Sequence, residues 1–374
     1  MAPTDTRPDD VADPALDLDL DLDLGLAPGP GLADPSSDPA AEFTRRTDPH
    51  RRELLAYCYR MLGSAHDAED LVQDTFLRVW RAYDRYDPQR ASMRTWLYRI
   101  ATNVCLTALE SRTRRPLPSG LGAPDDDPLT PLEFAPEVPW IQPIPDAWLA
   151  DPGQVVAARG SLRLAWVAAV QYLPARQRAV LILRDVLEWS AAETAALLET
   201  TPAAVNSALQ RARARLAGSG LAETRIAEEP ADRRVVDRYA AAFEKADIEA
   251  LTALLAHDAI LEMPPVSTWF IGRERYAGFM AWVYDANGTD WQVLRTAANG
   301  QPAIAAYVRR TSPAPDLGLS PGLSPDAVSE AATYKLHTLQ VFDLIAGRIT
   351  RNTVFQSPEV LASFGLPETL PPAS

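Results

Sequence analysis

A proline-rich segment in the middle of the chain constrains the fold more than any other sequence feature. Residues 116–152 contain ten prolines in 37 positions. Proline lacks a backbone N–H and clashes with the preceding helical turn, so neither a helix nor an interior strand continues through such a segment. The chain of 374 residues is therefore expected to form separate folded modules around an extended linker, as its length also suggests.

The net charge of −14 is distributed unevenly along the chain. Residues 42–115 and 154–218 each carry +4, whereas residues 1–41, 116–153 and 219–374 carry −9, −7 and −6. All 22 basic side chains of the two positive modules are arginines, which suit forked contacts to phosphates and base edges. The acidic average therefore does not exclude a nucleic-acid partner.

The remaining composition excludes several classes of protein. Two cysteines without a C-x-x-C pair exclude a disulfide scaffold and a zinc ribbon, and the four histidines lack metal-ligand spacing. No apolar run approaches the ~20 residues that span a bilayer. The acidic N-terminus lacks the basic start of a secretory signal. We expect a cytoplasmic protein that uses no metal, cofactor or membrane.

The first 41 residues are expected to form a disordered acidic tail. Leucine and aspartate alternate strictly over residues 16–24, between flanks rich in Pro, Gly and Asp. Such alternation also fits a strand, but the low complexity and the high charge favour disorder.

Residues 42–115 show helical periodicity in three stretches. We expect helices over residues 53–62, ending at Gly63, over residues 68–83, capped by Asp67, and over residues 93–111. The second helix has one apolar and one polar face. The residues assigned to its apolar face are Leu71, Val72, Thr75, Phe76, Val79 and Trp80. A helical bundle is therefore expected.

Residues 154–218 carry the pattern of a helix-turn-helix. Ser190 is expected to cap a short helix over residues 191–198. Thr201 and Pro202 then start a final helix over residues 203–217. This last helix carries arginines on its polar face, as a helix that enters the major groove of DNA does.

The chain changes character at about residue 231. We expect helices over residues 233–245, 247–255 and 273–284, mixed with strands. The expected strands cover residues 259–263, 291–298, 302–309, 333–344 and 348–355. Helices followed by a strongly bent antiparallel sheet describe an α+β cone over residues 231–367. The fold class is therefore multidomain, with two all-α modules and an α+β cone.

Three motifs in the helical modules resemble those of bacterial extracytoplasmic-function (ECF) sigma factors, group 4 of the sigma-70 family. DAEDLVQDTF at residues 67–76 is similar to the core-binding helix of region 2, and WLYRIATN at residues 96–103 to the start of the promoter-melting helix. LPARQRAV through ALQRAR, at residues 173–213, resembles region 4. The resemblance places region 2 at residues 42–115 and region 4 at residues 154–218, joined by the linker at 116–153.

The C-terminal part resembles a SnoaL-like domain of the NTF2-like superfamily. This resemblance rests on YAAAF at residues 239–243 and DAILEMPP at residues 258–265. Sigma factors with such a tail form recognised groups, and linker residues 138–146 resemble those of one actinobacterial group. The resemblance implies an alternative sigma factor that binds core RNA polymerase, recognises promoter −10 and −35 elements and starts transcription, with the tail regulating its activity.

The resemblance also assigns surfaces to partners. The polymerase β′ clamp helices would contact Glu69, Asp70, Gln73, Asp74 and Arg78, and the β flap would contact region 4. The −10 element would contact Arg90, Arg94, Trp96, Arg99 and Asn103. The −35 element would contact Asn206, Ser207, Gln210, Arg211, Arg213 and Arg215. Two alternatives stay open: the first set is an ordinary solvated helix face, or Trp96 is a core residue and Arg99 pairs with a local acid.

The linker and the cone carry the remaining predictions. With seven acids and no base over residues 116–153, the linker is expected to replace region 3 and follow the RNA path of the polymerase; the alternative is a solvated tether. Two large apolar residues, Trp140 and Ile141, indicate that the linker docks on a surface.

An apolar pocket for a small-molecule ligand is expected inside the cone. The residues expected to line it are Trp269, Phe270, Phe279, Trp282, Tyr307, His337 and Phe355. Asp258 and His337 are the titratable candidates for acid–base chemistry, but no catalytic pair is visible, so we expect no enzyme activity. A ligand-responsive DNA-binding repressor and a SnoaL-type enzyme fused to a DNA-binding module remain as alternative functions.

Overall fold

A computed structural model describes residues 38–111, 113–149, 160–217, 230–309 and 333–372. Most of the expected disordered tail therefore lies outside the described residues. Its last residues belong to a helix, α1 (Pro39–Thr47), which Asp38 caps by accepting a hydrogen bond from the Ala40 N–H. Throughout these ranges, we find no helix with the length and hydropathy needed to cross a membrane.

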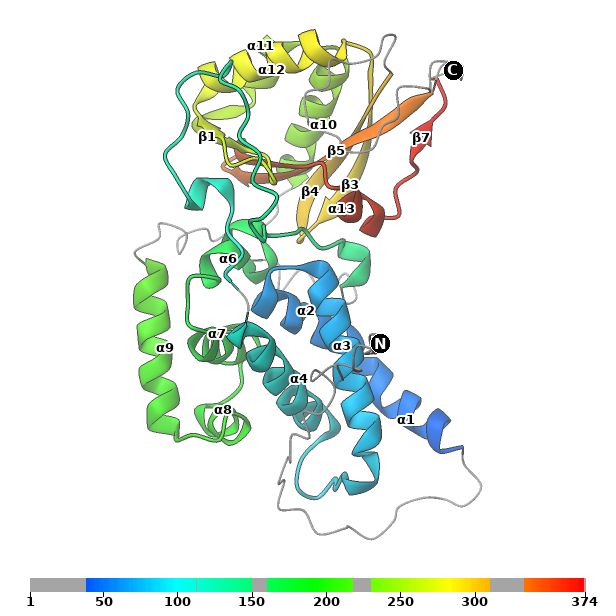
Figure 1. The fold of residues 1–374 in the computed structure, drawn as a ribbon, viewed down its shortest axis with the longest axis vertical. Coiled ribbons are helices and arrows are strands. Elements are labelled where there is room, and N and C mark those ends of the chain that lie inside the picture. The colour runs from blue at the N-terminus through cyan, green and yellow to red at the C-terminus, as the bar shows by residue number, and fades with distance from the viewer. Residues whose placement is uncertain (1–37, 112, 150–159, 218–229, 310–332, 373–374) are drawn as a thin grey trace, which may run out of the picture.

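The N-terminal module, residues 38–111, is a bundle of α1, α2 (Arg51–Leu62), α3 (Ala65–Arg81) and α4 (Met93–Glu110) (Figure 1). As predicted, α2 ends at Gly63, whose left-handed φ of 72° closes the helix. The predicted start of the next helix is wrong. Ser64, not Asp67, caps α3, because its hydroxyl accepts the Asp67 N–H at 3.2 Å.

The second helical module, residues 160–217, contains α6 (Leu164–Val170), α7 (Ala175–Leu181), α8 (Ala191–Leu197) and α9 (Pro202–Ala217). A π-helical turn, Ile182–Val186, extends α7. Ser190 and Glu193 form a reciprocal capping box at the start of α8. The Thr201 hydroxyl accepts the Ala204 N–H at 3.2 Å at the start of α9. Both predicted helix starts are confirmed.

The C-terminal domain, residues 230–372, packs α10 (Pro230–Glu244), α11 (Ile248–Ala253) and α12 (Arg273–Asn287) against a curved sheet. Its strands are β1 (Leu255–Glu262), β2 (Trp269–Ile271), β3 (Trp291–Ala298), β4 (Gln301–Val308), β5 (Tyr334–Ile345), β6 (Arg348–Phe355) and β7 (Thr369–Leu370). The strand order is β2-β1-β6-β5-β4-β3, and β7 pairs with β5. A short helix, α13 (Pro358–Ser363), follows β6.

The expectation of a wholly antiparallel sheet is wrong, because β1 and β6 pair in parallel. No tight turn joins these two strands, so nothing in their connection imposes an antiparallel pairing. The sequence also did not predict β2, β7 or α13, which are too short to show a periodicity.

The described part of the linker, residues 116–149, forms two short 3₁₀ turns, Pro118–Gly120 and Asp146–Trp148, and otherwise runs extended along the folded modules. Trp140 and Ile141 are buried, as is Ile144. The predicted docking of the linker is therefore confirmed.

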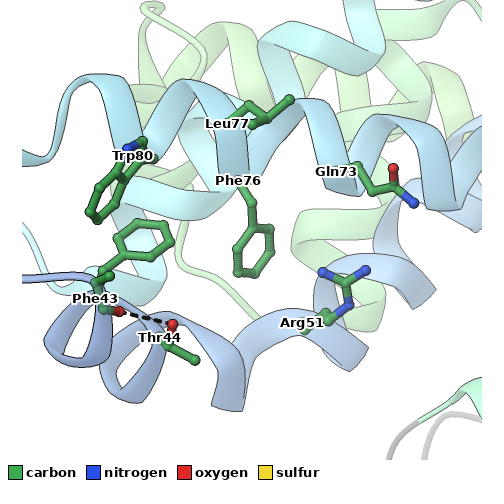
Figure 2. A pocket seen from close by; sticks show the side chains of 8 residues that line it. Phe43, Thr44, Arg51, Gln73, Phe76, Leu77 and Trp80 are labelled. Atoms are coloured by element: carbon green, nitrogen blue, oxygen red, sulfur yellow. Dashed lines mark hydrogen bonds between the residues drawn. The ribbon is translucent and has the colours of Figure 1, made fainter.

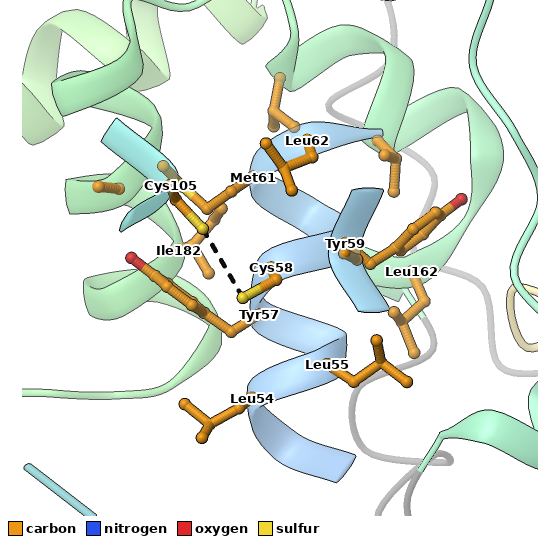
Figure 3. Packing of buried hydrophobic residues seen from close by; sticks show 14 of the residues in the cluster. Leu54, Leu55, Tyr57, Cys58, Tyr59, Met61, Leu62, Cys105, Leu162 and Ile182 are labelled. Carbon is orange, nitrogen blue, oxygen red and sulfur yellow. Dashed lines mark hydrogen bonds between the residues drawn. The ribbon is translucent and has the colours of Figure 1, made fainter. Parts of the chain in front are cut away.

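One hydrophobic cluster extends across the modules. Figure 3 shows its centre around α2, where Tyr57 and Cys58 pack against Cys105 of α4 and Ile182 of the second module. The same cluster extends to Ala298, Leu339 and Phe355 in the C-terminal sheet. The two helical modules and the C-terminal domain are therefore packed together and are not strung out on a flexible chain.

Candidate polymerase and promoter interfaces

The predicted polymerase-binding face lies along the solvent side of α3. Asp70 and Gln73 are exposed there, and Glu69 is half-buried. Asp74 and Arg78, one helical turn apart, form an ion pair with an N–O distance of 3.1 Å. The face is thus polar and accessible, and suits charged partners on a second helix.

An apolar groove of about 460 Å³ runs beside this face, between α1 and α3 (Figure 2). Leu77 and Trp80 lie along it with 56% and 42% of their surfaces exposed. Phe43 of α1 packs edge-on against Trp80, with ring centroids 5.0 Å apart. Of the predicted apolar face, Phe76 packs against the core, whereas Trp80 is exposed. The rings of both residues also pack against Phe43 of α1 and line the groove.

The residues predicted to contact the −10 element are not presented as one open stripe. Arg90 and Asn103 are exposed. Trp96 is buried and stacks on Tyr86, with ring centroids 5.0 Å apart. In this conformation the indole is a core side chain, as the alternative interpretation had it, because α4 turns it toward the loop that follows α3.

Two arginines of α4 are engaged by acids and by aromatic rings. Arg94 pairs with Glu53 at 3.0 Å and lies over the rings of Tyr98 and Trp189. Arg99 pairs with Glu199 at 2.5 Å. Because Trp189 and Glu199 belong to the second helical module, that module covers part of the α4 surface.

All six side chains predicted to contact the −35 element are exposed on α9. They are Asn206, Ser207, Gln210, Arg211, Arg213 and Arg215. Val205, Leu209 and Ala212 are buried on the opposite face, as predicted. Arg213 pairs with Asp185 at 2.6 Å. The polar face of this helix is therefore accessible to a partner.

Buried arginines join the two helical modules. Arg178 of α7 donates to the Met61 carbonyl at the end of α2 and to Gln171 Oε1 at 2.6 Å. Arg60 of α2 donates to the Ser161 hydroxyl at 3.1 Å. Burial lowers the pKa of both guanidinium groups to about 10. Both still carry their charge at neutral pH, so separating the modules would break charge-assisted hydrogen bonds.

The turn between β3 and β4 inserts Asn299 between the modules. This side chain is fully buried at a left-handed φ of 61°. Its Nδ2 donates to Tyr59 Oη and to the Leu162 carbonyl, both at 2.6 Å, and its Oδ1 accepts the Ile144 N–H at 3.0 Å. One residue of the C-terminal domain therefore bonds α2, the linker and the start of the second module.

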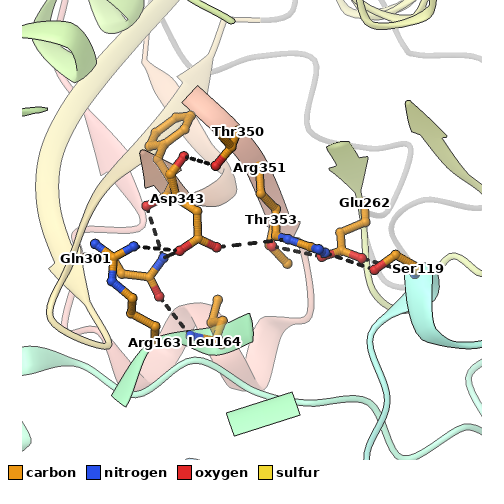
Figure 4. Close-up of polar contacts among 10 residues, drawn as sticks. Ser119, Arg163, Leu164, Glu262, Gln301, Asp343, Thr350, Arg351 and Thr353 are labelled. Carbon is orange, nitrogen blue, oxygen red and sulfur yellow. Dashed lines mark hydrogen bonds and ion pairs between the residues drawn. The ribbon is translucent and has the colours of Figure 1, made fainter. Parts of the chain in front are cut away.

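A buried cluster of ion pairs makes a second contact between the C-terminal domain and the rest of the chain (Figure 4). We call the Asn299 contacts and this cluster the two clasps. Arg163, just before α6, pairs with Asp343 of β5 at 3.0 Å, and Gln301 Nε2 donates to the same carboxylate at 2.9 Å. Nearby, Arg351 pairs with Glu262 at 2.5 Å and donates to the linker hydroxyl of Ser119. Burial raises the pKa of the Asp343 carboxyl.

The C-terminal domain holds a small apolar cavity beneath α12. Of the predicted pocket residues, Phe279, Trp282 and His337 line it. Trp269 and Tyr307 do not: the Trp269 indole donates to the linker carbonyl of Gly122, and Tyr307 is buried in a separate small cluster. Phe270 and Phe355 are also buried in packed clusters, outside the lining.

The titratable candidates are not brought together. Asp258 is exposed on β1 and does not line the cavity, whereas His337 does. No group of three or more His, Cys, Asp or Glu side chains suited to a metal ion occurs in the part of the chain that the structure describes.

Comparisons with known proteins match this architecture module by module. Residues 47–115 match sigma-70 region 2, residues 163–216 match sigma-70 region 4, and residues 236–352 match the SnoaL-like domain. The chain is 44% identical over 343 residues to the ECF RNA polymerase sigma factor SigG of Mycobacterium tuberculosis. This alignment covers 90% of this chain and 87% of SigG. The chain belongs to the ECF RNA polymerase sigma factors. It is an alternative sigma factor with a SnoaL-like C-terminal domain.

A solved structure of the M. tuberculosis ECF sigma factor SigJ has the same overall arrangement. The two structures align with a TM-score of 0.57 at 22% sequence identity. The alignment covers 88% of this chain and all of the SigJ chain. This likeness shows the fold of an ECF sigma factor in which regions 2 and 4 are followed by the C-terminal domain.

Sequence reasoning missed three residues that this sigma factor places at its interfaces. Phe43 and Leu77 line the groove beside α3, and Asn299 joins the modules. Phe43 was missed because the short helix α1 starts within the segment assigned to the tail. The sequence does carry a signal for Asn299: an Asn-Gly pair between two strand-like runs, which is typical of a tight hairpin turn.

Proposed function

We propose that this sigma factor is held inactive by its own C-terminal domain. On core polymerase, the outer face of α3 binds the β′ clamp helices and region 4 contacts the β flap. The α9 helix reads the −35 element in the major groove, and the loop at residues 87–92 with α4 holds the opened −10 strand. In the free chain, the clasps described above keep regions 2 and 4 packed together.

The observation that carries this proposal is the burial of Asn299 between region 2, the linker and region 4. A side chain that satisfies three partners from three segments ties their positions to one another. The same packing covers the part of α4 that pairs with Glu199 and Trp189. Promoter melting requires that surface, so the packed state must open before DNA is bound there.

The linker serves both states in this proposal. In the packed state it lies on the C-terminal domain; on polymerase its acidic residues follow the path of the RNA in place of region 3. The docked conformation is incompatible with that path, because Ile141 and Ile144 are buried in the shared core. Polymerase binding and linker release are therefore coupled.

We further propose that the C-terminal domain senses a ligand and does not catalyse a reaction. His337 is the one ionisable side chain among the described residues that line the cavity. It packs against Trp291, with the two ring centroids 5.4 Å apart. An acid–base mechanism of the kind that this fold supports needs a second positioned group. Apolar lining with a few polar side chains suits binding.

Run-off transcription with core polymerase tests the proposal. Replacing Asn299→Asp keeps the size of the side chain but turns its contact with the Leu162 carbonyl into an acceptor–acceptor contact. The Tyr59 hydroxyl can donate to the new carboxylate only by giving up its hydrogen bond to the Gln142 carbonyl. We expect about tenfold more promoter-specific transcript at limiting sigma factor, for a clasp weakened by about 1.4 kcal/mol. Ala346→Asp is the matched control, since it places the same carboxylate in the exposed β5–β6 turn, also at positive φ.

Equal transcription from the wild type and Asn299→Asp would contradict autoinhibition. Deleting the whole domain is a poorer test, because Ala298, Leu339 and Phe355 belong to the core that the sigma regions share. Absence of transcripts from every form, together with tight duplex binding without polymerase, would support the repressor alternative.

A further inference from the structure

The cavity of the C-terminal domain is partly filled by the linker. Its volume is about 50 Å³, enough for no more than a few water molecules. Every lining residue comes from the C-terminal domain except one, Leu132, which comes from the linker. Leu132 packs against the hydrophobic cluster of the domain as a partly buried side chain.

Backbone hydrogen bonds hold this part of the linker in place. The Asp125 N–H donates to the Trp269 carbonyl at 2.8 Å, the Ser267 N–H to the Glu133 carbonyl at 2.8 Å, and the Ala135 N–H to the Pro265 carbonyl at 3.0 Å. Residues 125–135 therefore contact the segment that contains β2 at both of their ends, through isolated β-bridges at Asp125 and Phe134. They insert Leu132, whereas Leu129 remains 67% exposed.

A polar side chain of the cavity wall has an unused hydrogen-bond acceptor. Asn352 is 1% exposed and lines the cavity. Its Nδ2 donates to Tyr276 Oη at 2.7 Å and to Gln340 Oε1 at 3.0 Å. Because Gln340 Oε1 only accepts, this contact sets which end of the Asn352 amide is the donor.

The other end of that amide, Asn352 Oδ1, has no hydrogen-bond partner among the described residues. A buried acceptor without a partner costs about 1–3 kcal/mol. Such an atom is therefore a place where a ligand that donates a hydrogen bond gains affinity, since it meets a need that the folded chain leaves open.

The lining around Asn352 selects against charge. Aromatic side chains supply much of the wall, including Phe243, Phe279, Trp282 and Trp291. Beside Asn352, the buried Tyr239 and Tyr276 hydroxyls hydrogen-bond to each other at 2.5 Å. Burial raises the pKa of Tyr276 to about 12 and holds the pKa of Tyr239 well above its usual value, so both remain neutral. His337 is the one ionisable side chain among the described lining residues, so a cationic ligand would be desolvated there without a carboxylate, and an anionic ligand would meet one imidazole at most.

We propose that this cavity binds an uncharged, ring-bearing molecule that donates a hydrogen bond to Asn352 Oδ1, and that this molecule competes with Leu132 for the same space. Binding then expels Leu132 and releases residues 125–135 from the edge of the domain. The consequence for transcription rests on the function proposed above; the competition itself does not.

Calorimetric titration of the full chain with 2-naphthol, an uncharged aromatic with one hydroxyl, tests the competition. Leu132→Ala is expected to bind this probe at least about tenfold more tightly than the wild type, because no side chain has to be expelled. Leu129→Ala, three residues away and exposed, is expected to bind as the wild type does. 2-Methoxynaphthalene, which lacks the donor, is expected to bind about tenfold more weakly or worse.

Hydrogen exchange supplies a readout that ordinary ligand stabilisation would not give. Saturating 2-naphthol is expected to speed exchange of the Ala135 and Ser267 amides, which are bonded across the linker, and to slow exchange elsewhere in the domain. Absence of 2-naphthol binding to Leu132→Ala would overturn the proposal, as would equal affinity for the two probes. Slower exchange at Ala135 would also overturn it.

The two proposals fail separately. A chain that responds to Asn299→Asp in transcription but does not bind 2-naphthol contradicts only the ligand site. A chain that binds 2-naphthol as described but transcribes equally with and without the Asn299 change contradicts only autoinhibition.

Discussion

The helices α4 and α9 are both expected to contact promoter DNA, but the structure presents them in opposite ways. On α9, all six predicted contact residues are exposed and the apolar residues face inward. On α4, Trp96 is buried, and Arg94 and Arg99 are paired with acids. The surface predicted to read the −35 element is therefore accessible, whereas part of the surface predicted to contact the −10 element is covered by region 4.

This difference indicates where regulation can act. A duplex-reading helix can stay exposed, because duplex contacts alone do not open a promoter. Under the proposed autoinhibition, the surface predicted to hold unpaired bases stays covered until polymerase is bound. The clasps at Asn299 and Arg163 are positioned to hold region 4 over α4. Breaking them should increase the exposure of α4 and leave the exposure of α9 unchanged.

The largest effect is expected from Arg163→Met. It leaves the buried Asp343 without its closest cation, which costs about 3–5 kcal/mol of unfolding free energy. Chemical denaturation measures this loss. Burial raises the pKa of Asp343 in the folded chain, and the loss of the Arg163 charge removes a group that lowers it. Protonation then neutralises the unpaired carboxylate more readily, so the loss of stability should shrink as the pH falls.

Arg295→Met is the control for that change, because its ion pair with Asp237 is exposed and is worth about 1 kcal/mol or less. Equal destabilisation by both variants would show that the buried clasp has no special role in holding region 4 to the C-terminal domain.

The next largest effect is expected on the open face of α3. Replacing Asp70→Lys together with Asp74→Lys reverses two charges there and should weaken polymerase binding about 100-fold or more, while circular dichroism stays unchanged. Fluorescence anisotropy with core polymerase measures the affinity. Glu249→Lys with Glu274→Lys makes the same charge change on exposed acids of the C-terminal domain, and is expected to leave polymerase binding within about twofold.

A smaller effect is expected on α9. Gln210→Ala should cost about 1–3 kcal/mol of DNA-binding free energy through one position of the −35 element, and should relax the base preference at that position. Arg211→Ala should instead weaken binding to all sequences alike. It should also reduce the slope of log binding constant against log salt concentration by about 1. Binding to a panel of −35 variants separates the two. Uniform weakening by Gln210→Ala would remove it from the base-reading set.

The smallest effect is expected from Glu199→Ala, which frees Arg99 of α4. An exposed pair is worth about 0.2–1 kcal/mol, so promoter opening should rise up to about fivefold. Permanganate footprinting of the −10 region measures the opening. Asp185→Ala, which frees Arg213 on α9, is the matched control and should not increase opening.

The helical modules were predictable from the sequence because their signals are local. Gly63, Ser190 and Thr201 end or start helices through their own backbone geometry or hydroxyl groups. The buried and exposed faces of α9 followed from the spacing of Val205 and Leu209. The start of α3 was misassigned, because Ser64 and Asp67 are both good capping residues and only the geometry decides between them.

The tertiary contacts were not predictable, because they join residues far apart in the chain. Trp80 was assigned to the apolar face of α3, but it is exposed in a groove where Phe43 of α1 packs beside it. The parallel pairing of β1 with β6 has no local signal. Nothing in the sequence around Leu132 or Asn352 indicates that one side chain enters the cavity whose wall contains the other.

The most direct test of the account measures the separation of regions 2 and 4 in the free chain. Spin labels at Arg85→Cys and Ala214→Cys, both exposed, allow this by pulsed electron paramagnetic resonance, since the native Cys58 and Cys105 are buried. The account predicts one short distance in the free protein, and a longer one both in Asn299→Asp and on core polymerase. An unchanged distance in all three states would contradict it.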